Sequence, residues 1–341
     1  MKKTLLLLGI ILVTVCQTKA QTVIGKYAGE FMAIGVGGRA LGMGGAYVGI
    51  ANDVTAGYYN PAGLAAIDYP EIALMHDEQF GSLVNYDYAA AAIPVGKNFT
   101  FAISIMRLGI DGIPDTRNAL VDANGDGVKN IQTDRLDYSK ITQFSNQDWA
   151  FYLSFAKRAS DKFYFGGNVK IIRESLAEYG AWGVGFDVGV WYNPVGKLTL
   201  GANLQDITTT VVAWNTGRTE LITPTAKLGV GYQVHFLGGE FTPALDVDVR
   251  FENRQFSSYA YIGPVSFDTH TGLEYSFKNL IAVRVGYNDV KQFTLGAGIR
   301  LPKLSIDYSF ARFSSSPDQR LPDSHRISLI LTLEEPKFMR K

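Results

Sequence analysis

Apolar and polar side chains alternate along most of this chain. Between residues 182 and 193 the even positions are aromatic or aliphatic, while the odd positions are glycine, aspartate or asparagine, with Trp191 as the exception. The same period of two recurs at 226–236, 245–251 and 293–300. Because successive side chains of a β-strand point to opposite faces, the pattern predicts strands with one apolar face and one polar or glycine-rich face.

About fourteen segments follow this pattern, so the chain is predicted to be all-β. They lie at about 71–76, 84–93, 99–107, 147–158, 163–175, 181–193, 198–204, 223–233, 241–251, 266–277, 281–288, 292–300, 304–312 and 325–333. Several reach about nine to eleven residues, the length of a tilted membrane strand rather than of the shorter strands of soluble sheets.

Two architectures can use such strands. A transmembrane antiparallel β-barrel turns the apolar face to lipid and the polar face to its lumen, whereas a soluble sandwich or propeller buries the apolar face. Asp246, Asp248 and Arg250 share the polar face with glycine and serine positions on other strands, as expected of a lumen. We therefore favour the barrel and keep an exported soluble β-protein as the alternative.

The first twenty residues read as a secretory signal peptide. Two lysines at positions 2 and 3 precede an apolar run of about a dozen residues, and Thr18-Lys19-Ala20 supplies small residues for cleavage. The run is too short for a membrane-spanning helix, and no later segment is long enough either. Cys16 lies within the signal and follows a valine, which favours cleavage after Ala20 over lipoprotein processing. The mature chain then has no cysteine, and we expect it in the outer membrane.

Composition narrows the classes of function. The 341 residues carry 32 basic and 32 acidic side chains, and loss of the signal peptide with its three lysines leaves a small acidic excess. A chain without a basic surplus or a basic run is not expected to bind nucleic acid. The mean hydropathy of +0.04 resembles that of a soluble protein, but two opposite strand faces average to the same value.

Residues 29–67 do not alternate and are rich in glycine. No phosphate-binding loop pattern occurs there, and the loose dinucleotide pattern at 35–40 lacks the βαβ unit it would need. Glycine permits close backbone approach and positive φ, so the segment is predicted to fill space inside the molecule.

Two stretches of this segment resemble a known family. Positions 38–48 read GRALGMGGAYV, and Asn52-Asp53 and the sequence YNPAGL at 59–64 follow. They resemble the N-terminal signature of the PorV/PorQ family, which belongs to the wider FadL-like outer-membrane barrels. The signature positions are Gly38, Arg39, Gly42, Gly44, Gly45, Asn60, Pro61 and Ala62.

The resemblance implies a fourteen-stranded barrel whose N-terminal segment folds into the lumen as a plug or hatch. The predicted organisation is a signal peptide at 1–20, a plug or hatch at 21–68, a barrel at 69–334 and a C-terminal tail at 335–341. It also implies an interaction role in type IX protein secretion, with secretion-system proteins or exported cargo as partners beside the outer-membrane lipid. The alternative that the resemblance offers is a FadL-like channel for hydrophobic small molecules.

One loop has the pattern of a calcium site. Oxygen-bearing or carbonyl ligands would come from loop positions 1, 3, 5, 7 and 9 of a sequence that starts D-A-N-G-D-G. These positions are Asp122, Asn124, Asp126, Val128 and Asn130. The twelfth position is Thr133 rather than glutamate, so a loop chosen only for its turns is an equal alternative.

Catalysis is not predicted. His76, His235, His270 and His325 are scattered, and the chain has neither an H-E-x-x-H nor a G-x-S-x-G sequence. We therefore expect a protein that is not an enzyme, with calcium as the one candidate cofactor.

Overall fold

The computed structural model describes residues 29–340 except 124, 126, 129, 133, 252–257 and 315–321. The predicted signal peptide lies outside these residues. Among the described residues, no helix is long and apolar enough to cross a membrane.

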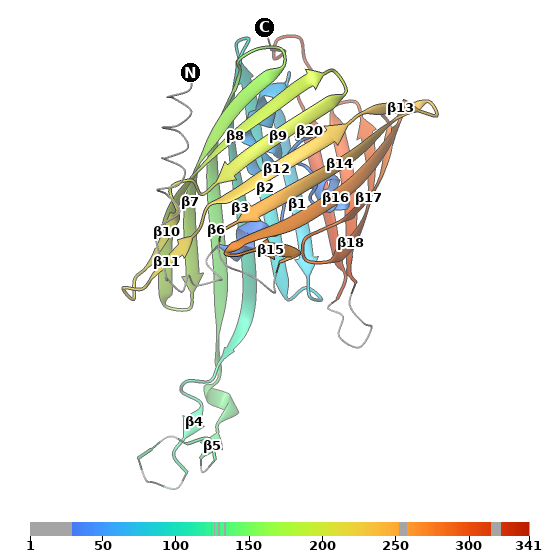
Figure 1. Ribbon diagram of the computed structural model, residues 1–341. Coiled ribbons are helices and arrows are strands. Elements are labelled where there is room, and N and C mark those ends of the chain that lie inside the picture. Colours follow the sequence, from blue (N-terminus) through green and yellow to red (C-terminus); the bar gives the residue numbers. More distant parts are fainter. Residues whose placement is uncertain are drawn as a thin grey trace, which may run out of the picture.

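Fourteen antiparallel strands form a closed barrel (Figure 1). In order around the wall they are β1 (Glu71–Gln79), β2 (Val84–Val95), β3 (Phe99–Asp115), β6 (Thr142–Arg158), β7 (Phe163–Leu176), β8 (Tyr179–Val195), β9 (Leu198–Gln205), β12 (Thr225–Tyr232), β14 (Gly239–Arg250), β16 (Val265–Phe277), β17 (Ile281–Tyr287), β18 (Gln292–Leu301), β19 (Leu304–Phe313) and β20 (Ser324–Thr332). The first and last strands pair with each other, with Glu71 opposite Thr332, and this pairing closes the cylinder. The predicted all-β barrel of about fourteen strands is confirmed.

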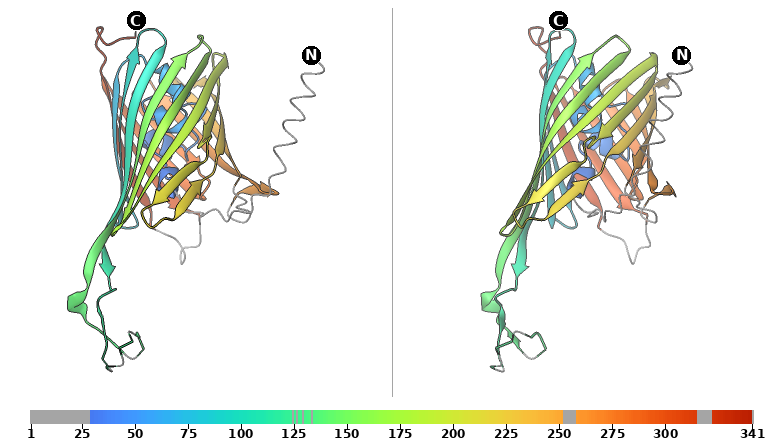
Figure 2. Two further views of the ribbon diagram at one scale, coloured as in Figure 1. Left: turned by 90° about the vertical axis from the view of Figure 1, so that its left-hand side faces the viewer. Right: turned by 60° about the vertical axis from the view of Figure 1, so that its left-hand side comes forward.

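Shorter strands are appended to this wall. The hairpin of β10 (Thr210–Trp214) and β11 (Thr219–Ile222) pairs with β8, β13 (Val234–Phe236) pairs with β14, and β15 (Ala260–Ile262) pairs with β16. An arm protrudes from one end, where β3 and β6 continue beyond the barrel (Figure 2). It carries β4 (Leu120–Val121), β5 (Arg135–Leu136) and the short helix η3 (Tyr138–Lys140).

The two ends of the barrel differ in their connections. At one end, which we call the turn end, neighbouring strands of the wall are joined by two to six residues, as at 196–197, 302–303 and 233–238. The other end, which we call the loop end, carries the long connections 116–141, 206–224, 251–264 and 314–323. Residue 71, where β1 starts, and residue 332, where β20 ends, both lie at the turn end.

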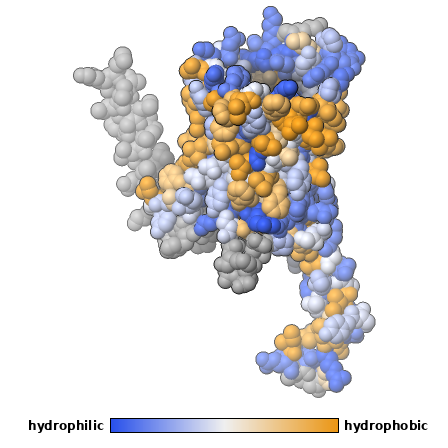
Figure 3. Space-filling view, turned by 90° about the vertical axis from the view of Figure 1, so that its right-hand side faces the viewer, coloured by the Kyte–Doolittle hydropathy of each residue, from blue (hydrophilic) through white to orange (hydrophobic). Residues whose placement is uncertain are grey.

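Side chains alternate between the outside and the inside of the wall. Leu74, Ile103 and Leu153 point outward and are more than half exposed, and a continuous apolar band covers the middle of the face seen in Figure 3. The inward positions are polar or small, for example Asp187 at 1% exposure and Ala282 at 1%. The period-two pattern therefore separates the two faces of a single wall.

Two sequence expectations need correction. The run at 226–236 is not one strand, because it is interrupted at Gln233 and continues as β13. The strands predicted at about 99–107 and 147–158 are longer than expected, since β3 reaches Asp115 and β6 begins at Thr142. There the two strands pair only with each other outside the barrel, so one face no longer packs against a core and the alternation is lost.

Candidate functional site in the barrel lumen

Residues 29–67, which we call the N-terminal segment, lie within the barrel (Figures 1 and 2). The segment contains η1 (Glu30–Ala33), α2 (Gly38–Gly42), α3 (Ala56–Tyr59) and η2 (Pro61–Ala66), and most of its residues are buried. α2 contacts β17, β18 and β19, whereas η2 contacts β6, β7 and β8. The segment thus bridges opposite parts of the wall.

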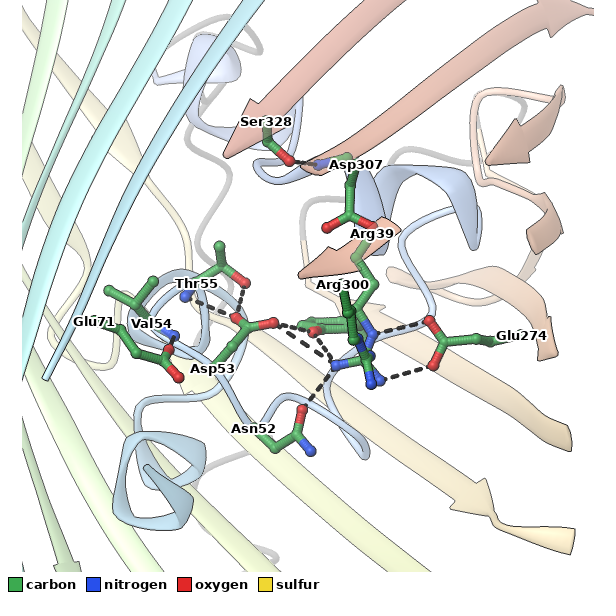
Figure 4. A network of polar contacts seen from close by, with 12 residues as sticks. Arg39, Asn52, Asp53, Val54, Thr55, Glu71, Glu274, Arg300, Asp307 and Ser328 are labelled. Atoms are coloured by element: carbon green, nitrogen blue, oxygen red, sulfur yellow. Dashed lines mark hydrogen bonds and ion pairs between the residues drawn. The ribbon is translucent and has the colours of Figure 1, made fainter. Parts of the chain in front are cut away.

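The first contact, which we call the Arg39 interface, joins α2 and the following turn to β16–β19. Arg39 forms a bidentate pair with Glu274, with Nε 3.0 Å from Oε2 and Nη2 2.9 Å from Oε1 (Figure 4). Its Nη1 donates to the hydroxyl of Tyr47 at 3.0 Å and to Asn52 at 2.8 Å. Asp53 accepts from the same tyrosine at 2.5 Å, so Arg39 organises both the wall and its own segment.

A second arginine supports this interface from the wall. Arg284 donates to Glu274 at 2.6 Å and to Asp307 at 2.6 Å, and its side chain is 1% exposed. Burial alone would lower the pKa of Arg39, but Glu274, Tyr47 and Asp53 together outweigh burial and raise it well above its usual value. Arg39 therefore stays charged, and its pairing with Glu274 offsets part of the large cost of burying both ions.

The predicted glycines of this stretch allow close backbone contact. A Cβ on Gly38 would lie 2.8 Å from the carbonyl oxygen of Asp307, and one on Gly42 would lie 3.0 Å from the Cα of Gly296. Gly44 and Gly45 have φ of 65° and 82°, a region that strongly favours glycine. These four signature positions thus set how near the segment can approach the wall.

The second contact, the Asn60 interface, joins α3 and η2 to β6–β9, and no residue at 56–66 has a charged side chain. Asn60 is fully buried and donates to the carbonyl oxygens of Val48 at 3.1 Å and Val190 at 3.0 Å. Its side-chain oxygen accepts from the backbone of Ala62 at 3.2 Å, which caps η2 next to Pro61. Two asparagines of the wall extend the contact, because Asn168 donates to the carbonyl of Gly57 and Asn203 to that of Tyr59.

Glycines of the wall make room for the Asn60 interface. A Cβ on Gly189 would collide with Asn60, one on Gly201 with the carbonyl oxygen of Val48, and one on Gly166 with the backbone of Pro61 at 2.7 Å. The structure therefore places all eight signature residues at the two interfaces, the first five at one and the last three at the other.

Sequence reasoning missed the partners of these residues. In the sequence, Glu274, Arg284 and Asp307 are only charges on the polar parity of their strands, and nothing marks Asn168 and Asn203 as partners. Two features together could have identified these partners: a position on the lumen-facing side of a strand, and a charged or amide side chain. An ion that faces the inside of a barrel needs a partner.

Two arginines hold the point where the segment leaves the lumen. Arg158 donates to the carbonyl oxygens of Ala65 at 2.6 Å and Ala66 at 3.2 Å. Arg340, from the C-terminal tail, donates to Ile67 at 2.6 and 3.0 Å and to Thr100 at 2.6 Å. Burial and the nearby Arg158 charge lower the pKa of Arg340 to about 10. The tail is therefore part of the packing at the turn end.

A cavity lies on each side of α2. The loop-end cavity, of about 310 Å³, lies between Leu41, Tyr58 and Tyr59 of the segment and charged residues of β12, β14 and β16. The turn-end cavity, of about 680 Å³, is polar and includes Arg39 and Glu274 in its lining. Because Arg39 faces one cavity and Leu41 the other, α2 stands between them.

The predicted calcium loop is described only in part. Asn124 and Asp126 lie outside the described residues. The Asp122 carboxylate accepts from the backbone of Gly125 at 2.6 Å and Gly127 at 2.8 Å, and Asp134 accepts from Asn130 at 2.8 Å. In the part of the chain that is described, no group of three or more His, Cys, Asp or Glu residues is arranged to hold a metal. Calcium binding by this loop stays a prediction.

The fold and its interior define a β-barrel with polypeptide inserted in its lumen. No family model matches the sequence, and no curated protein matches it. Among solved structures, the toluene transporter TbuX of Ralstonia pickettii has a TM-score of 0.58 at 12% identity over 87% of this chain and 98% of that chain.

Two further structures are similar. The Pseudomonas putida toluene transporter TodX has a TM-score of 0.58 at 14% identity over 88% of this chain and 99% of that chain. A Pseudomonas aeruginosa FadL homologue has a TM-score of 0.53 at 14% identity over 86% and 98%. The chain therefore has a FadL-like fold. The three similar structures are two toluene transporters and a FadL homologue, and none of them is described as an enzyme.

Proposed function

We propose that this protein is a non-catalytic outer-membrane channel that admits hydrophobic small molecules. The observation that carries the proposal is the loop-end cavity inside the lumen, whose inner wall is made by Ile34, Leu41 and two tyrosines of the N-terminal segment. An apolar surface inside a polar lumen is suited to a ligand with an apolar body. The fold shared with two toluene transporters supports the same class of ligand.

Membrane placement follows from the outer wall. An apolar band around a barrel fits the hydrocarbon core, and outer-membrane barrels carry short periplasmic turns and longer extracellular loops. We therefore assign the turn end, with the C-terminal tail, to the periplasm and the loop end, with the arm, to the exterior. The signal peptide expected at 1–20 provides export.

The N-terminal segment acts as the plug in this proposal. A ligand in the loop-end cavity meets α2 before it can reach the turn-end cavity, and α2 is fixed by the Arg39 interface. Passage then requires the segment to shift, with the Arg39–Glu274 pair as the contact that breaks. Glu274 keeps Arg284 as a partner during such a shift, which reduces the cost of an unpaired buried carboxylate.

The type IX secretion role is a second hypothesis that rests on the PorV/PorQ resemblance alone. None of the three compared structures is described as a secretion component. We rank it below the channel, with secretion-system proteins or exported cargo as the partners it would require.

A deletion strain separates the two hypotheses. We expect slower uptake of toluene at low external concentration, or of long-chain fatty acids, and an unchanged set of secreted proteins. Normal uptake of both kinds of compound would contradict the channel. Loss of exported cargo with normal uptake would favour the secretion role instead.

A further inference from the structure

The loop-end cavity has two unlike walls. The N-terminal segment contributes apolar and tyrosine side chains and one acid, Glu30, while the barrel contributes Lys227, Asp246, Asp248, Arg250 and His270. A ligand that fills the cavity therefore touches carbon on one side and charge on the other. A plain hydrocarbon would leave the charged wall unused.

The charged side chains at the cavity include more carboxylates than cations. Among the described residues that line the cavity or pair with its lining, the acids are Glu30, Asp246, Asp248, Asp268 and Asp289. The bases are Lys227, Arg250 and His270, and the nearby Arg326 is neutralised by buried Asp77 at 2.8 Å. Even with His270 protonated, the acids remain in excess.

The cations are already engaged with these acids. Lys227 lies 2.5 Å from Asp248, and Arg250 lies 3.5 Å from Asp248, 3.7 Å from Asp268 and 3.6 Å from Asp289. A ligand carboxylate would have to compete with these neighbours for each cation. Its own charge would also add to the acidic excess.

One carboxylate oxygen of the wall, Oδ1 of Asp246, lacks a hydrogen-bond donor among the described residues. Asp246 is 1% exposed, and its Oδ2 accepts from the backbone of Tyr47 at 2.6 Å and Val48 at 2.7 Å. The ring of His270 does not supply a donor to Oδ1, since its Nδ1 donates to the carbonyl of Gly44 at 2.9 Å and its Nε2 lies 3.6 Å from the Asp248 carboxylate.

We infer that the loop-end cavity prefers apolar ligands that end in a cationic or hydrogen-bond-donating group, such as a primary amine, over hydrocarbons and carboxylates. This inference rests on the proposed channel function and specifies its substrate class. The apolar body lies against Leu41 and Tyr59, and the donor end faces the carboxylates of Asp246 and Asp289.

Four ligands with one body and different ends test the inference on the purified full chain in detergent. They are toluene, benzyl alcohol, benzylamine and benzoate, and binding is measured at pH 7 by competition against one radiolabelled probe, toluene. We expect benzylamine to bind about tenfold more tightly than toluene, and benzoate to bind more weakly than toluene.

Asp289→Asn removes one acid from the rim with little change in shape, since Asp289 lies in the turn after β17. We expect this variant to lose most of the preference for benzylamine over toluene. Glu178→Gln, which removes an acid outside the cavity, is the matched control and should change neither affinity.

The outcomes separate the inference from the channel proposal. Equal binding of toluene, benzylamine and benzoate would overturn the inference and leave the channel intact. A preference for benzylamine that survives Asp289→Asn and Asp246→Asn together would also overturn it. No saturable binding of any of the four ligands would count against the channel proposal itself.

Discussion

The Arg39 interface and the Asn60 interface fix the same segment by different physics. The Arg39 interface uses a buried bidentate ion pair with a second arginine behind it, whereas the Asn60 interface uses amide hydrogen bonds and wall glycines. The two ions of a pair can exchange partners. A backbone packed against a wall glycine has no such alternative, because the contact depends only on the space that the missing side chain leaves. We therefore expect the Asn60 interface to anchor the segment and the Arg39 interface to release it.

The largest effect is expected from filling one wall glycine of the Asn60 interface. In Gly201→Val, the new side chain would collide with the carbonyl oxygen of Val48, which is backbone and cannot rotate away. Overpacking of this kind costs about 3 kcal/mol or more. Limited proteolysis of the purified protein should show about 100-fold faster cleavage within 29–67.

Leu200→Val, on the outward face of the same strand, is the control and should leave cleavage unchanged. Heat-modifiable gel mobility reports whether each variant still forms a barrel. Slow, wild-type cleavage in a folded Gly201→Val protein would show that this interface does not anchor the segment.

A smaller effect is expected from breaking the Arg39 interface. Arg39→Met keeps the length of the side chain but removes its charge, while Glu274 retains Arg284 as a partner. We therefore expect the packing of the segment against the wall to lose about 2 kcal/mol of stability. Arg39→Lys should have an effect between those of wild type and Arg39→Met, because an ammonium keeps the charge but cannot form the bidentate pair. Ion conductance in planar bilayers should rise in the order wild type, lysine, methionine.

Arg300→Met is the control for charge, since Arg300 lines the same turn-end cavity without contacting Glu274. Equal conductance for wild type and Arg39→Met would mean that the ion pair does not restrain the segment.

The contacts of Arg340 at the turn end should contribute less to holding the N-terminal segment in place. Arg340→Met removes the tail's donors to the carbonyl oxygen of Ile67 and to Thr100, while Arg158 still holds Ala65. We expect about 1 kcal/mol of destabilisation, seen as a modest rise in cleavage near 65–70. A change as large as that of Gly201→Val would mean that the tail, and not the Asn60 interface, is the main anchor.

The smallest effect on the two interfaces is expected from removing calcium. If the loop at 122–134 binds the ion, a chelator should increase cleavage of the arm and leave cleavage at 29–67 unchanged. Equal cleavage of the arm with and without chelator would refute the calcium site.

Sequence periodicity predicted the wall well because each strand places its own side chains on alternate faces. The pattern at 182–193 falls within β8, and that at 266–277 within β16. The short hairpin of β10 and β11 was missed because its few residues hold too little alternation to detect. The glycines and Asn60-Pro61 located the signature residues in the sequence. The sequence did not predict that these residues divide between two interfaces. That division depends on barrel closure, which brings Arg39 to Glu274 across 235 positions of sequence.

The most direct test of the account is the initial rate of toluene uptake by intact cells of a deletion strain that express wild type or Arg39→Met at equal outer-membrane levels. The account predicts that wild type restores uptake above the empty strain and that Arg39→Met takes up toluene faster still. Uptake at the empty-strain rate with both proteins would contradict a channel whose lumen is controlled by the N-terminal segment.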